Sequence, residues 1–390
     1  MFSEDSLNTW ETTAANRHKV RVYPLKNKDG SVEQNAYVVA TEEHTSGYDY
    51  QDVVYIVRNA KPVGEPAPDT QEIDAPNPKE LVFSGVKGST NLPTQSVSVK
   101  NSGRTALEIS GASISGTNAG AFQLVNPGAK SVPAGETATF EVRFAPGSTT
   151  VGSLSAKLTI ASNDADEANV DVGLYGLSTN GEQGSNEPTL QDVVNTLGYP
   201  AKVHDLAGNP LTFGTDGNLK GEEVSAPLFQ KAGTGNVTIK PVARYSPDEI
   251  LPFGYYKLPD GNVTENVVAT IDLDQEQTLN PKVQPGGSSS FDPGTDKFGV
   301  FVDSKSFNRK SYQQDGLNTG QVAHAVRVYP AKDRAGQPIA NSYLVTFEDA
   351  ANGDYQDYVF FVTNVKPSSA GNTGTGTSSK INFQPATAEV

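Results

Sequence analysis

Two distant segments of the chain repeat the same pattern, and this repeat constrains the fold more than any other feature. Residues 5–62 and 315–367 each begin with Leu-Asn-Thr after a short lead, continue with Val-Arg-Val-Tyr-Pro, and end in an acidic phrase. That phrase reads SGYDYQDVVYIVRNAKP at 46–62 and NGDYQDYVFFVTNVKP at 352–367. A repeat with so many residues between its copies indicates two copies of one domain rather than a solenoid of stacked units.

The second copy is preceded by a long segment that belongs with it, whereas nothing comparable precedes the first. This segment opens with a predicted helix, capped by Thr189 with Asp192 at the third position. Strand-like runs follow, including GNVTIKPVARY, FGYYKL, NVVATIDL and KFGVFVDS. We predict that residues 187–367 form a complete β-sandwich with a short N-terminal helix. Residues 1–63 would form only the C-terminal half of such a sandwich. The helix carries one apolar stripe that must lie on a sheet: Leu190, Val193, Val194 and Leu197.

A half-domain on its own would expose unpaired strand edges and an uncovered apolar face, which favours pairing with another chain. Residues 368–379 have the composition of a flexible Gly/Ser/Thr linker, and residues 380–390, KINFQPATAEV, are predicted as a single strand. A single strand does not stand alone. We therefore expect head-to-tail association, in which the last strand of one chain joins the incomplete front of the next. The alternative is that the two ends are arbitrary cuts through a longer protein.

The middle of the chain has the period-two alternation of an antiparallel sandwich. Runs such as QSVSVKNSG, ATFEVRFAP and NVDVGLYG alternate apolar and polar residues, with turn signals between them. Residues 80–178 are predicted as a seven-stranded immunoglobulin-like domain, flanked by linkers at 64–79 and 179–186. The predicted fold class is therefore mostly β: a multi-domain chain of antiparallel β-sandwiches. The succession from LVFSGVKGSTNLPTQSVSVKNSG to VGLYG also resembles the ASH/Hydin-like, or choice-of-anchor D, domain. This resemblance implies a spacer or protein-binding module without catalysis.

Each acidic phrase places four carboxylates at one end of a predicted hairpin. In the second copy these are Glu348, Asp349, Asp354 and Asp357, and in the first copy Glu42, Glu43, Asp49 and Asp52. Such crowding is unfavourable without a cation or basic side chains among the acids, and oxygen ligands without His or Cys suit Ca²⁺. We predict a calcium site in each copy. The alternatives are solvated loop carboxylates, or ion pairs with Arg21, Arg327 and Lys366.

The acidic hairpin resembles that of calcium-binding β-domains in secreted bacterial proteins, in which an Asp-x-Asp-aromatic-Asn-Asp run follows the loop. This chain departs from that run, because Gln51 and Gln356 replace Asn, and Tyr48 and Gly353 replace the first Asp. These departures leave the number of ligands open. More broadly, residues 187–367 resemble an uncharacterised domain of large bacterial surface proteins. Residues 380–390 resemble the first strand of a malectin-like domain, which binds carbohydrate.

Composition excludes several classes of function. The chain has 45 acidic and 30 basic residues and a net charge of −15, which disfavours nucleic acid and anionic membrane surfaces as partners. No apolar run is long enough to insert into a membrane. There is no Cys, so disulfides and thiolate metal sites are excluded. No nucleophile elbow, phosphate loop or zinc spacing is present, and we predict no enzyme activity. The equivalent His18 and His324 are expected to be structural.

These observations together predict a non-enzymatic structural or adhesive segment of an extracellular or cell-surface bacterial protein. It would be stiffened by calcium and would assemble head to tail into a fibre by strand complementation. The alternative is a carbohydrate-binding module of a bacterial surface protein or secreted hydrolase. The aromatic residues of FGYYK, which are Phe253, Tyr255 and Tyr256, could stack on a sugar but are also typical of a core strand.

Overall fold

The structure is a computed structural model that describes residues 1–28, 30–45, 47–60, 70–204, 214–320 and 322–368. For residues 15 and 34 only the backbone is described. The chain divides into two compact units, residues 1–68 and 69–390, and each is described by itself. The predicted linker is 368–379; its first residue, Ser368, ends a strand, and its remaining residues and the predicted strand at 380–390 lie outside the described residues. Within the described part of the chain, no helix is both long and apolar enough to cross a lipid bilayer.

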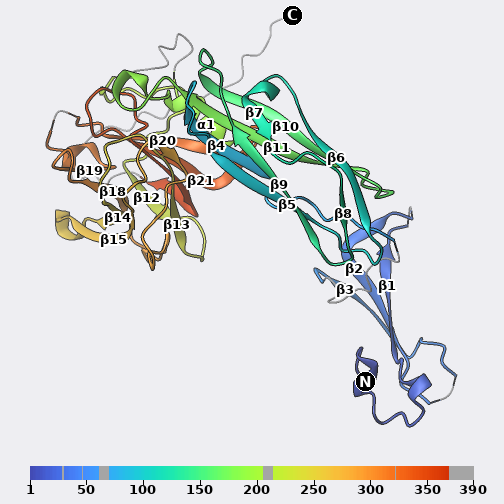
Figure 1. The fold of residues 1–390 in the computed structure, drawn as a ribbon. Coiled ribbons are helices and arrows are strands. Elements are labelled where there is room, and N and C mark those ends of the chain that lie inside the picture. Colours follow the sequence, from blue (N-terminus) through green and yellow to red (C-terminus); the bar gives the residue numbers. More distant parts are fainter. Residues whose placement is uncertain (29, 46, 61–69, 205–213, 321, 369–390) are drawn as a thin grey trace, which may run out of the picture. The chain divides into compact units, whose positions relative to one another are not determined.

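The first unit contains a single antiparallel sheet in the order β1-β2-β3 (Figure 1). Its strands are β1 (Val20–Lys26), β2 (Val32–Thr41) and β3 (Val53–Arg58), and two single 3-10 turns precede them at Asp5–Leu7 and Ala14–Asn16. Most side chains of β1 and β3 are exposed, on both faces of the sheet. The exposed apolar ones include Val22, Tyr23, Val53, Val54, Tyr55 and Ile56. Among the described residues of this unit, no second layer covers the sheet.

The second unit begins with an immunoglobulin-like sandwich of two sheets, ordered β4-β11-β10-β6-β8 and β5-β9-β7. It has eight strands, one more than the predicted seven, and two of the eight contain only three residues. They are β4 (Glu80–Val86), β5 (Thr94–Lys100), β6 (Leu107–Ser115), β7 (Phe122–Leu124), β8 (Lys130–Val132), β9 (Thr137–Phe144), β10 (Gly152–Ser162) and β11 (Asn169–Thr179). One pair departs from the antiparallel pattern, since β4 runs parallel to β11.

The core of this sandwich is formed by the alternating apolar residues predicted from the sequence, including Val97, Val99, Phe140, Leu158 and Val172, all inaccessible. The sandwich starts before residue 80, however. Ile73, in the segment predicted as a linker, is 3% exposed and belongs to the same core. The backbone N–H of Ile73 donates to Asp164 at 2.7 Å, and residues 73 and 77 bridge to β5 and the residue after it. Residues 70–79 are therefore a strap of the domain, and the predicted boundary is corrected accordingly.

The rest of the second unit is a larger sandwich, which contains the second copy of the repeat. One sheet has the order β16-β13-β22-β21-β20, with β17 also paired to β13, and the other has the order β15-β14-β18-β19. A two-stranded ribbon, β12-β23, lies beside them. The strands are β12 (Leu228–Lys231), β13 (Val237–Arg244), β14 (Leu251–Lys257), β15 (Thr264–Ile271), β16 (Thr278–Leu279), β17 (Ser290–Phe291), β18 (Gly299–Ser304), β19 (Arg309–Tyr312), β20 (Val326–Lys332), β21 (Pro338–Phe347), β22 (Tyr358–Thr363) and β23 (Val365–Ser368).

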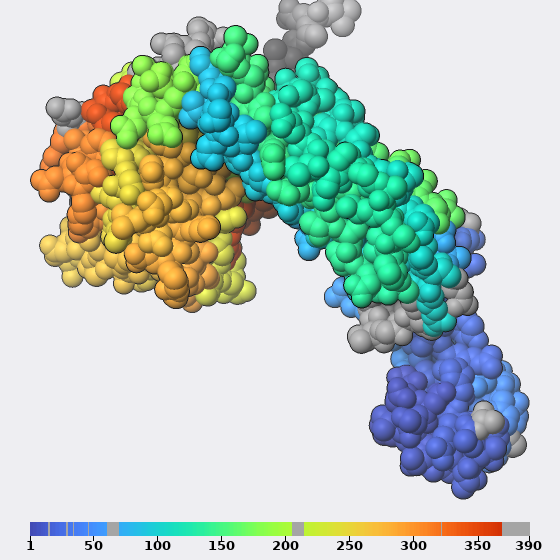
Figure 2. Space-filling model, in the orientation of Figure 1, coloured from blue at the N-terminus to red at the C-terminus, as the bar shows by residue number. Residues whose placement is uncertain are grey.

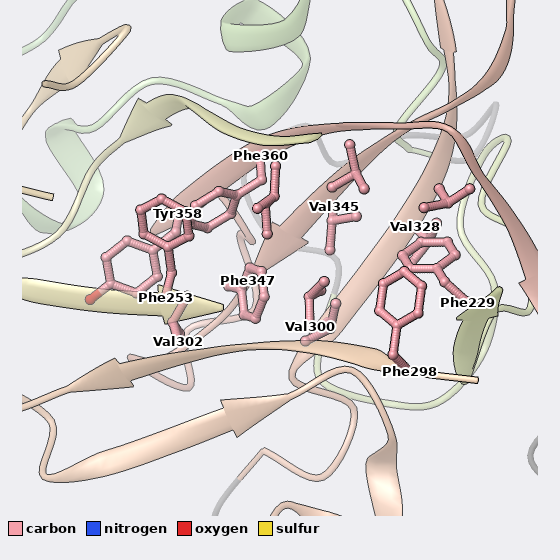
Figure 3. Packing of buried hydrophobic residues seen from close by; sticks show 14 of the residues in the cluster. Phe229, Phe253, Phe298, Val300, Val302, Val328, Val345, Phe347, Tyr358 and Phe360 are labelled. Atoms are coloured by element: carbon pink, nitrogen blue, oxygen red, sulfur yellow. The ribbon is translucent and has the colours of Figure 1, made fainter. Parts of the chain in front are cut away.

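Aromatic and β-branched side chains fill the space between the two sheets of this sandwich (Figure 3). Phe360 of β22 lies against Phe253 of β14, with ring centroids 4.9 Å apart, and against Phe347 of β21 at 5.6 Å. Val328 and Val345 come from β20 and β21, and Val300 and Val302 from the opposite sheet (Figure 3). Burial of a large apolar side chain contributes roughly 1.5–3 kcal/mol to folding, so this layer stabilises the inner face of β20–β22.

The other face of the same sheet is covered by the only α-helix among the described residues, α1 (Leu190–Leu197). As predicted, Thr189 caps it: its side chain accepts from the backbone N–H of Asp192 at 3.0 Å. The predicted stripe packs against side chains of β13, β20, β21 and β22. It also packs against Leu177 of β11, so this core is shared with the immunoglobulin-like sandwich. Figure 2 shows the cyan surface of β4 directly beside the light-green surface around α1.

Candidate functional site

The two acidic hairpins are built in the same way, because the strands that carry them have matching registers. In the second copy Val326 pairs with Phe347, and Phe347 pairs with Tyr358. In the first copy Val20 pairs with Thr41, and Thr41 pairs with Val53. Both β1–β2 and β20–β21 have a register shift after the proline. The repeat therefore specifies one hairpin geometry twice, with the predicted carboxylates at the same end of each sheet.

In the second copy, two of the predicted carboxylates hold the loop together by accepting backbone hydrogen bonds. Glu348 Oε2 accepts from the N–H of Asp354 at 2.8 Å and of Tyr355 at 3.3 Å. Asp357 Oδ2 accepts from the N–H of Asp349 at 2.5 Å and of Ala350 at 3.2 Å. Bonds from amide groups to a carboxylate are charge-assisted and favour the ionised form. These two acids therefore have a structural role whether or not an ion binds beside them.

All four acids of the second hairpin are buried: Glu348 and Asp349 are inaccessible, and Asp354 is 8% and Asp357 3% exposed. Burial raises the pKa of Asp349 to about 7, and burial together with the charge of Glu348 raises the pKa of Asp354 to about 7. Burial and the neighbouring acids raise the pKa of Asp357 well above its usual range. One oxygen each of Asp349 and Asp354 is buried without a hydrogen-bond partner. Negative charge is under-compensated here, and a proton or a cation would relieve it.

The first hairpin is different, because only Glu42 is buried and Glu43, Asp49 and Asp52 are exposed. Glu42 again accepts loop N–H groups, from His44 at 3.0 Å and Tyr50 at 3.3 Å. Asp52 Oδ2 accepts from the N–H of Glu43 at 2.6 Å. The first hairpin thus keeps the loop hydrogen bonds of the second, but its acids are not buried by neighbouring segments. Exposed carboxylates are hydrated by water and need no ion.

The basic residues considered as partners of the acids have other contacts. Arg327 donates to Glu223 at 2.5 Å and lies 4.4 Å from the ring centre of Tyr355. Arg21 lies 4.1 Å from the ring centre of Tyr50. Each arginine therefore packs on the tyrosine of its hairpin rather than neutralising the carboxylates. The structure records no ion pair of Lys366 with a hairpin acid.

Sequence analysis missed polar residues from outside the hairpin that meet it. Glu187, just before α1, accepts from Gln277 Nε2 at 2.5 Å and from Gln356 Nε2 of the hairpin at 3.4 Å. Desolvation raises the pKa of Glu187, and the charge of Glu348 adds to this effect. The repeated Gln of the acidic phrase was the one sequence signal for such a contact. Its partners are remote in sequence, and no local pattern identifies them.

A separate acidic group lies at the edge of the immunoglobulin-like sandwich. Ligand atoms of Glu72, Asp164 and Asp166 lie within 4.8 Å of one another, and among the described residues no other group of three acidic or histidine ligands does so. The eight predicted carboxylates do not form such a group. Asp164 Oδ1 accepts from the N–H groups of Asp166 at 3.2 Å and Glu167 at 3.3 Å, which makes it a loop-stabilising residue.

The two equivalent histidines make carboxylate contacts. His324 Nδ1 lies 3.0 Å from Asp315 and Nε2 lies 3.0 Å from Glu223, and the His side chain is 13% exposed. His18 contacts only Asp5, at 3.1 Å, with its side chain 55% exposed. Burial lowers the pKa of His324, but the two carboxylates raise it by more, to about 9. Both histidines therefore contact carboxylate side chains.

The aromatic residues of FGYYK belong to the core. Phe253 and Tyr256 are inaccessible. Tyr255 stacks on Phe291, with ring centroids 4.3 Å apart. None of these rings is presented as a free platform for a sugar.

The uncovered sheet of the first unit is the second candidate site. One of its faces forms a groove of about 570 Å³, lined in part by Val20, Val22, Val39, Val53 and Tyr55. By the matching registers, their counterparts in the second copy are Val326, Val328, Val345, Tyr358 and Phe360, all at most 3% exposed. A surface that is a core in one copy is thus open in the other.

Comparisons with known proteins give distant fold neighbours. No family model matches the chain, and no curated protein matches it. Among solved structures, an ASH/PapD-like domain of human CEP192 is 14% identical with a TM-score of 0.22, covering 32% of this chain and 96% of its own. The MSP-domain protein SSP-19 of Caenorhabditis elegans is 12% identical (TM-score 0.20; 26% and 98% covered). The secreted serine protease VesC of Vibrio cholerae is also 12% identical (TM-score 0.21; 73% and 48% covered).

Proposed function

We propose that the chain is a non-enzymatic structural or adhesive segment of an extracellular surface protein, and that it assembles head to tail by strand complementation. The observation that carries this proposal is the open sheet β1-β2-β3. Val54 and Ile56 of β3 are 55% and 49% exposed, whereas of their counterparts in β22 Val359 is inaccessible and Phe361 is half-buried. An exposed apolar sheet with a free edge is a surface for pairing with another chain.

The complete copy supplies a template for the missing strand. There β13 pairs with the edge of β22 that does not face β21, with Thr238 opposite Thr363 and Pro241 opposite Phe360. By the matching registers, the equivalent residues of β3 are Arg58 and Tyr55. The same edge of β3 pairs with no strand among the described residues. A strand that resembles β13 would therefore complete the first copy.

The final segment of this chain has the pattern of β13. Residues 237–243, VTIKPVA, and residues 381–387, INFQPAT, both alternate apolar and polar side chains and then place a proline at the fifth position. Superposing the two patterns puts Asn382 opposite Arg58 and Pro385 opposite Tyr55 of a neighbouring chain. The Gly/Ser/Thr-rich residues before it would act as a flexible tether. Because donor and acceptor lie at opposite ends, the contact is heterologous and repeats without closing.

Calcium is proposed as a stabiliser of the hairpins rather than as part of a reaction. In the second copy the support is the burial of four carboxylates, two of which have an oxygen without a partner. Hard oxygen ligands of this kind suit Ca²⁺, and extracellular modules bind it at concentrations that stabilise loops. Extracellular calcium is millimolar, which is consistent with the proposed location.

Light scattering of the full chain over a concentration series tests the assembly. We expect the mass to rise with concentration and elongated particles to be visible by electron microscopy. A matched chain that ends at residue 379, without the proposed donor strand, should remain monomeric. A full chain that stays monomeric at high concentration would exclude the assembly, and equal assembly by the shortened chain would exclude the final strand as donor.

A further inference from the structure

The contacts of Glu187 connect the acidic hairpin to segments of the larger sandwich that precede the repeat and have no counterpart among the described residues of the first unit. Glu187 precedes α1, which covers one face of the sheet, and Gln277 precedes β16, which pairs with β13 in the same sheet. Both residues come from the part of the domain that precedes the repeat. Gln356 belongs to the hairpin and reaches Glu187 from the other side, with Nε2 to Oε2 at 3.4 Å. Oxygen-bearing side chains from three separated segments therefore meet at one place.

Several of these oxygens are buried and have no partner. They include Gln277 Oε1, Gln356 Oε1 and Asp354 Oδ1. Gln356 is 1% exposed and Asp354 8% exposed, so water does not hydrate them freely. A buried acceptor without a donor is unfavourable by roughly 1–3 kcal/mol, and three of them in one place need an explanation.

The charges around these oxygens are negative. The negative charges of Glu348 and Glu187 raise the pKa of Asp354. The negative charge of Glu348 also raises the pKa of Glu187. Carboxylate and amide oxygens without nitrogen or sulfur ligands select hard cations, and irregular sets from several segments suit Ca²⁺ better than Mg²⁺. A divalent cation would supply positive charge and a partner for Asp354 Oδ1 and the two amide oxygens. To bind Glu187 as well, it would replace the Nε2 groups of Gln277 and Gln356, which donate to that carboxylate.

We infer that Glu187, Asp354 and Gln356, with Gln277 beside them, form a site for a divalent cation of the Ca²⁺ class that clamps the hairpin to the covering half of its domain. This inference rests on the proposed calcium-stabilised role and assigns ligands outside the acidic hairpin itself. Glu348 and Asp357 continue to accept hydrogen bonds from loop N–H groups and so hold the shape of the loop that carries the site.

The first copy shows what the hairpin does without the clamp. Its Gln51 donates from Nε2 to Asp49 Oδ2 at 2.7 Å, within the same loop. Neither residue has a buried oxygen without a partner, and both are exposed. Among the described residues of the first unit, no acid lies where Glu187 lies in the complete copy. A monomeric chain should therefore bind one cation tightly, not two.

Isothermal titration of the full chain with CaCl₂, at a concentration where light scattering shows a monomer, tests this inference. We expect a stoichiometry of one, and at least a tenfold loss of affinity in Glu187→Gln. The matched variant Glu182→Gln removes the same charge from an exposed position five residues earlier and should bind normally. Melting in EDTA checks that both variants fold as the parent does.

Three outcomes would overturn the clamp: no binding at millimolar Ca²⁺, two equivalent sites in the monomer, or unchanged affinity in Glu187→Gln. Loss of binding in Asp49→Asn would also overturn it, because the ion would then sit in the first hairpin. Assembly is measured separately by the mass in EDTA. If binding fails while the mass still rises, the clamp is wrong and the assembly stands. If the cation binds but the mass does not rise with concentration, the assembly is excluded and the clamp stands.

Discussion

The same three-stranded sheet occurs twice in this chain, once covered on both faces and once open. In the complete copy, β20–β22 lie between α1 on one side and the β14–β18 sheet on the other. In the first copy, β1–β3 keep the same pairing register with neither layer present among the described residues. The local pattern thus sets the strand pairing, while burial depends on the covering segment. Stability should follow burial, because apolar area removed from water is the main favourable term in folding.

The largest expected difference is at one matched aromatic position. Phe360→Ala removes an inaccessible ring packed against Phe253 and Phe347, and should destabilise its domain by about 3–5 kcal/mol. Tyr55→Ala changes the equivalent residue of β3, which is 46% exposed. It should change the stability of the monomer by about 0.5 kcal/mol or less. Hydrogen exchange of peptides from β20–β22 and from β1–β3 measures the stability of each copy separately within the full chain. Equal effects would show that the first sheet is covered after all.

The two histidines should differ in how they link stability to pH. The pKa of His324 is raised to about 9 in the folded state, above its unfolded value. The protonated form is therefore favoured by folding, and its contribution is fully present below about pH 6.5 and is lost as the pH rises to about 9. The loss should be about 3 kcal/mol, seen as weaker exchange protection around β20. His324→Asn should remove this pH dependence, whereas His18→Asn should leave it. A flat profile in the parent chain would contradict the assignment.

Calcium should stabilise the complete copy more than the open one. At millimolar Ca²⁺ and a Kd of ~10⁻⁴ M, binding adds ~1.5 kcal/mol to the free energy of unfolding. EDTA should lower the melting temperature, and Ca²⁺ should restore it more fully than Mg²⁺. Exchange protection should change at the hairpin of residues 348–357 and not at residues 42–52 of the monomer. No response to EDTA at either hairpin would exclude calcium as a stabiliser.

The smallest expected difference concerns the tyrosine of each hairpin. Tyr355 Oη donates to the carbonyl of His324 at 2.5 Å, and Tyr50 Oη donates to that of His18 at 2.5 Å. Tyr355→Phe should destabilise by about 1 kcal/mol, because the carbonyl is left without this donor in a buried setting. Tyr50→Phe should cost less, since water can replace the hydroxyl at an exposed loop. A larger destabilisation by Tyr50→Phe than by Tyr355→Phe would contradict the view that the second hairpin is the more buried one.

Much of the fold could be predicted because it is encoded locally. The repeated Val-Arg-Val-Tyr-Pro strands carry the same register in both copies, and the stripe of α1 with its Thr189 cap is buried as expected. The repeat also predicts a three-stranded sheet in the first copy, and the described residues of the first unit form that sheet. These features depend on period, capping and turn residues, which a sequence shows directly.

Other features depend on which distant segments meet, and the sequence does not show them. Ile73 is one apolar residue in a proline-rich stretch and looked like part of a linker, yet it fills the immunoglobulin-like core. Leu177 alternates like any strand residue, and nothing local indicates that it packs on α1. Glu187 and Gln277 have no spacing that relates them to the hairpin they contact. The sequence therefore predicts the acidic hairpin of the candidate site but not the residues of other segments that contact it.

Because the chain contains no native cysteine, an engineered disulfide tests the central claim most directly. Thr238 and Thr363 face each other in the complete copy with their Oγ1 atoms 2.6 Å apart. Their counterparts in the proposed contact are Asn382 and Arg58, so a chain carrying Asn382→Cys and Arg58→Cys should form a ladder of disulfide-linked oligomers under mild oxidation. The pair Asn382→Cys and Val57→Cys, slipped by one residue, points to opposite faces and should form far fewer. Monomers only, or equal ladders from both pairs, would contradict a registered strand donated from one chain to the next.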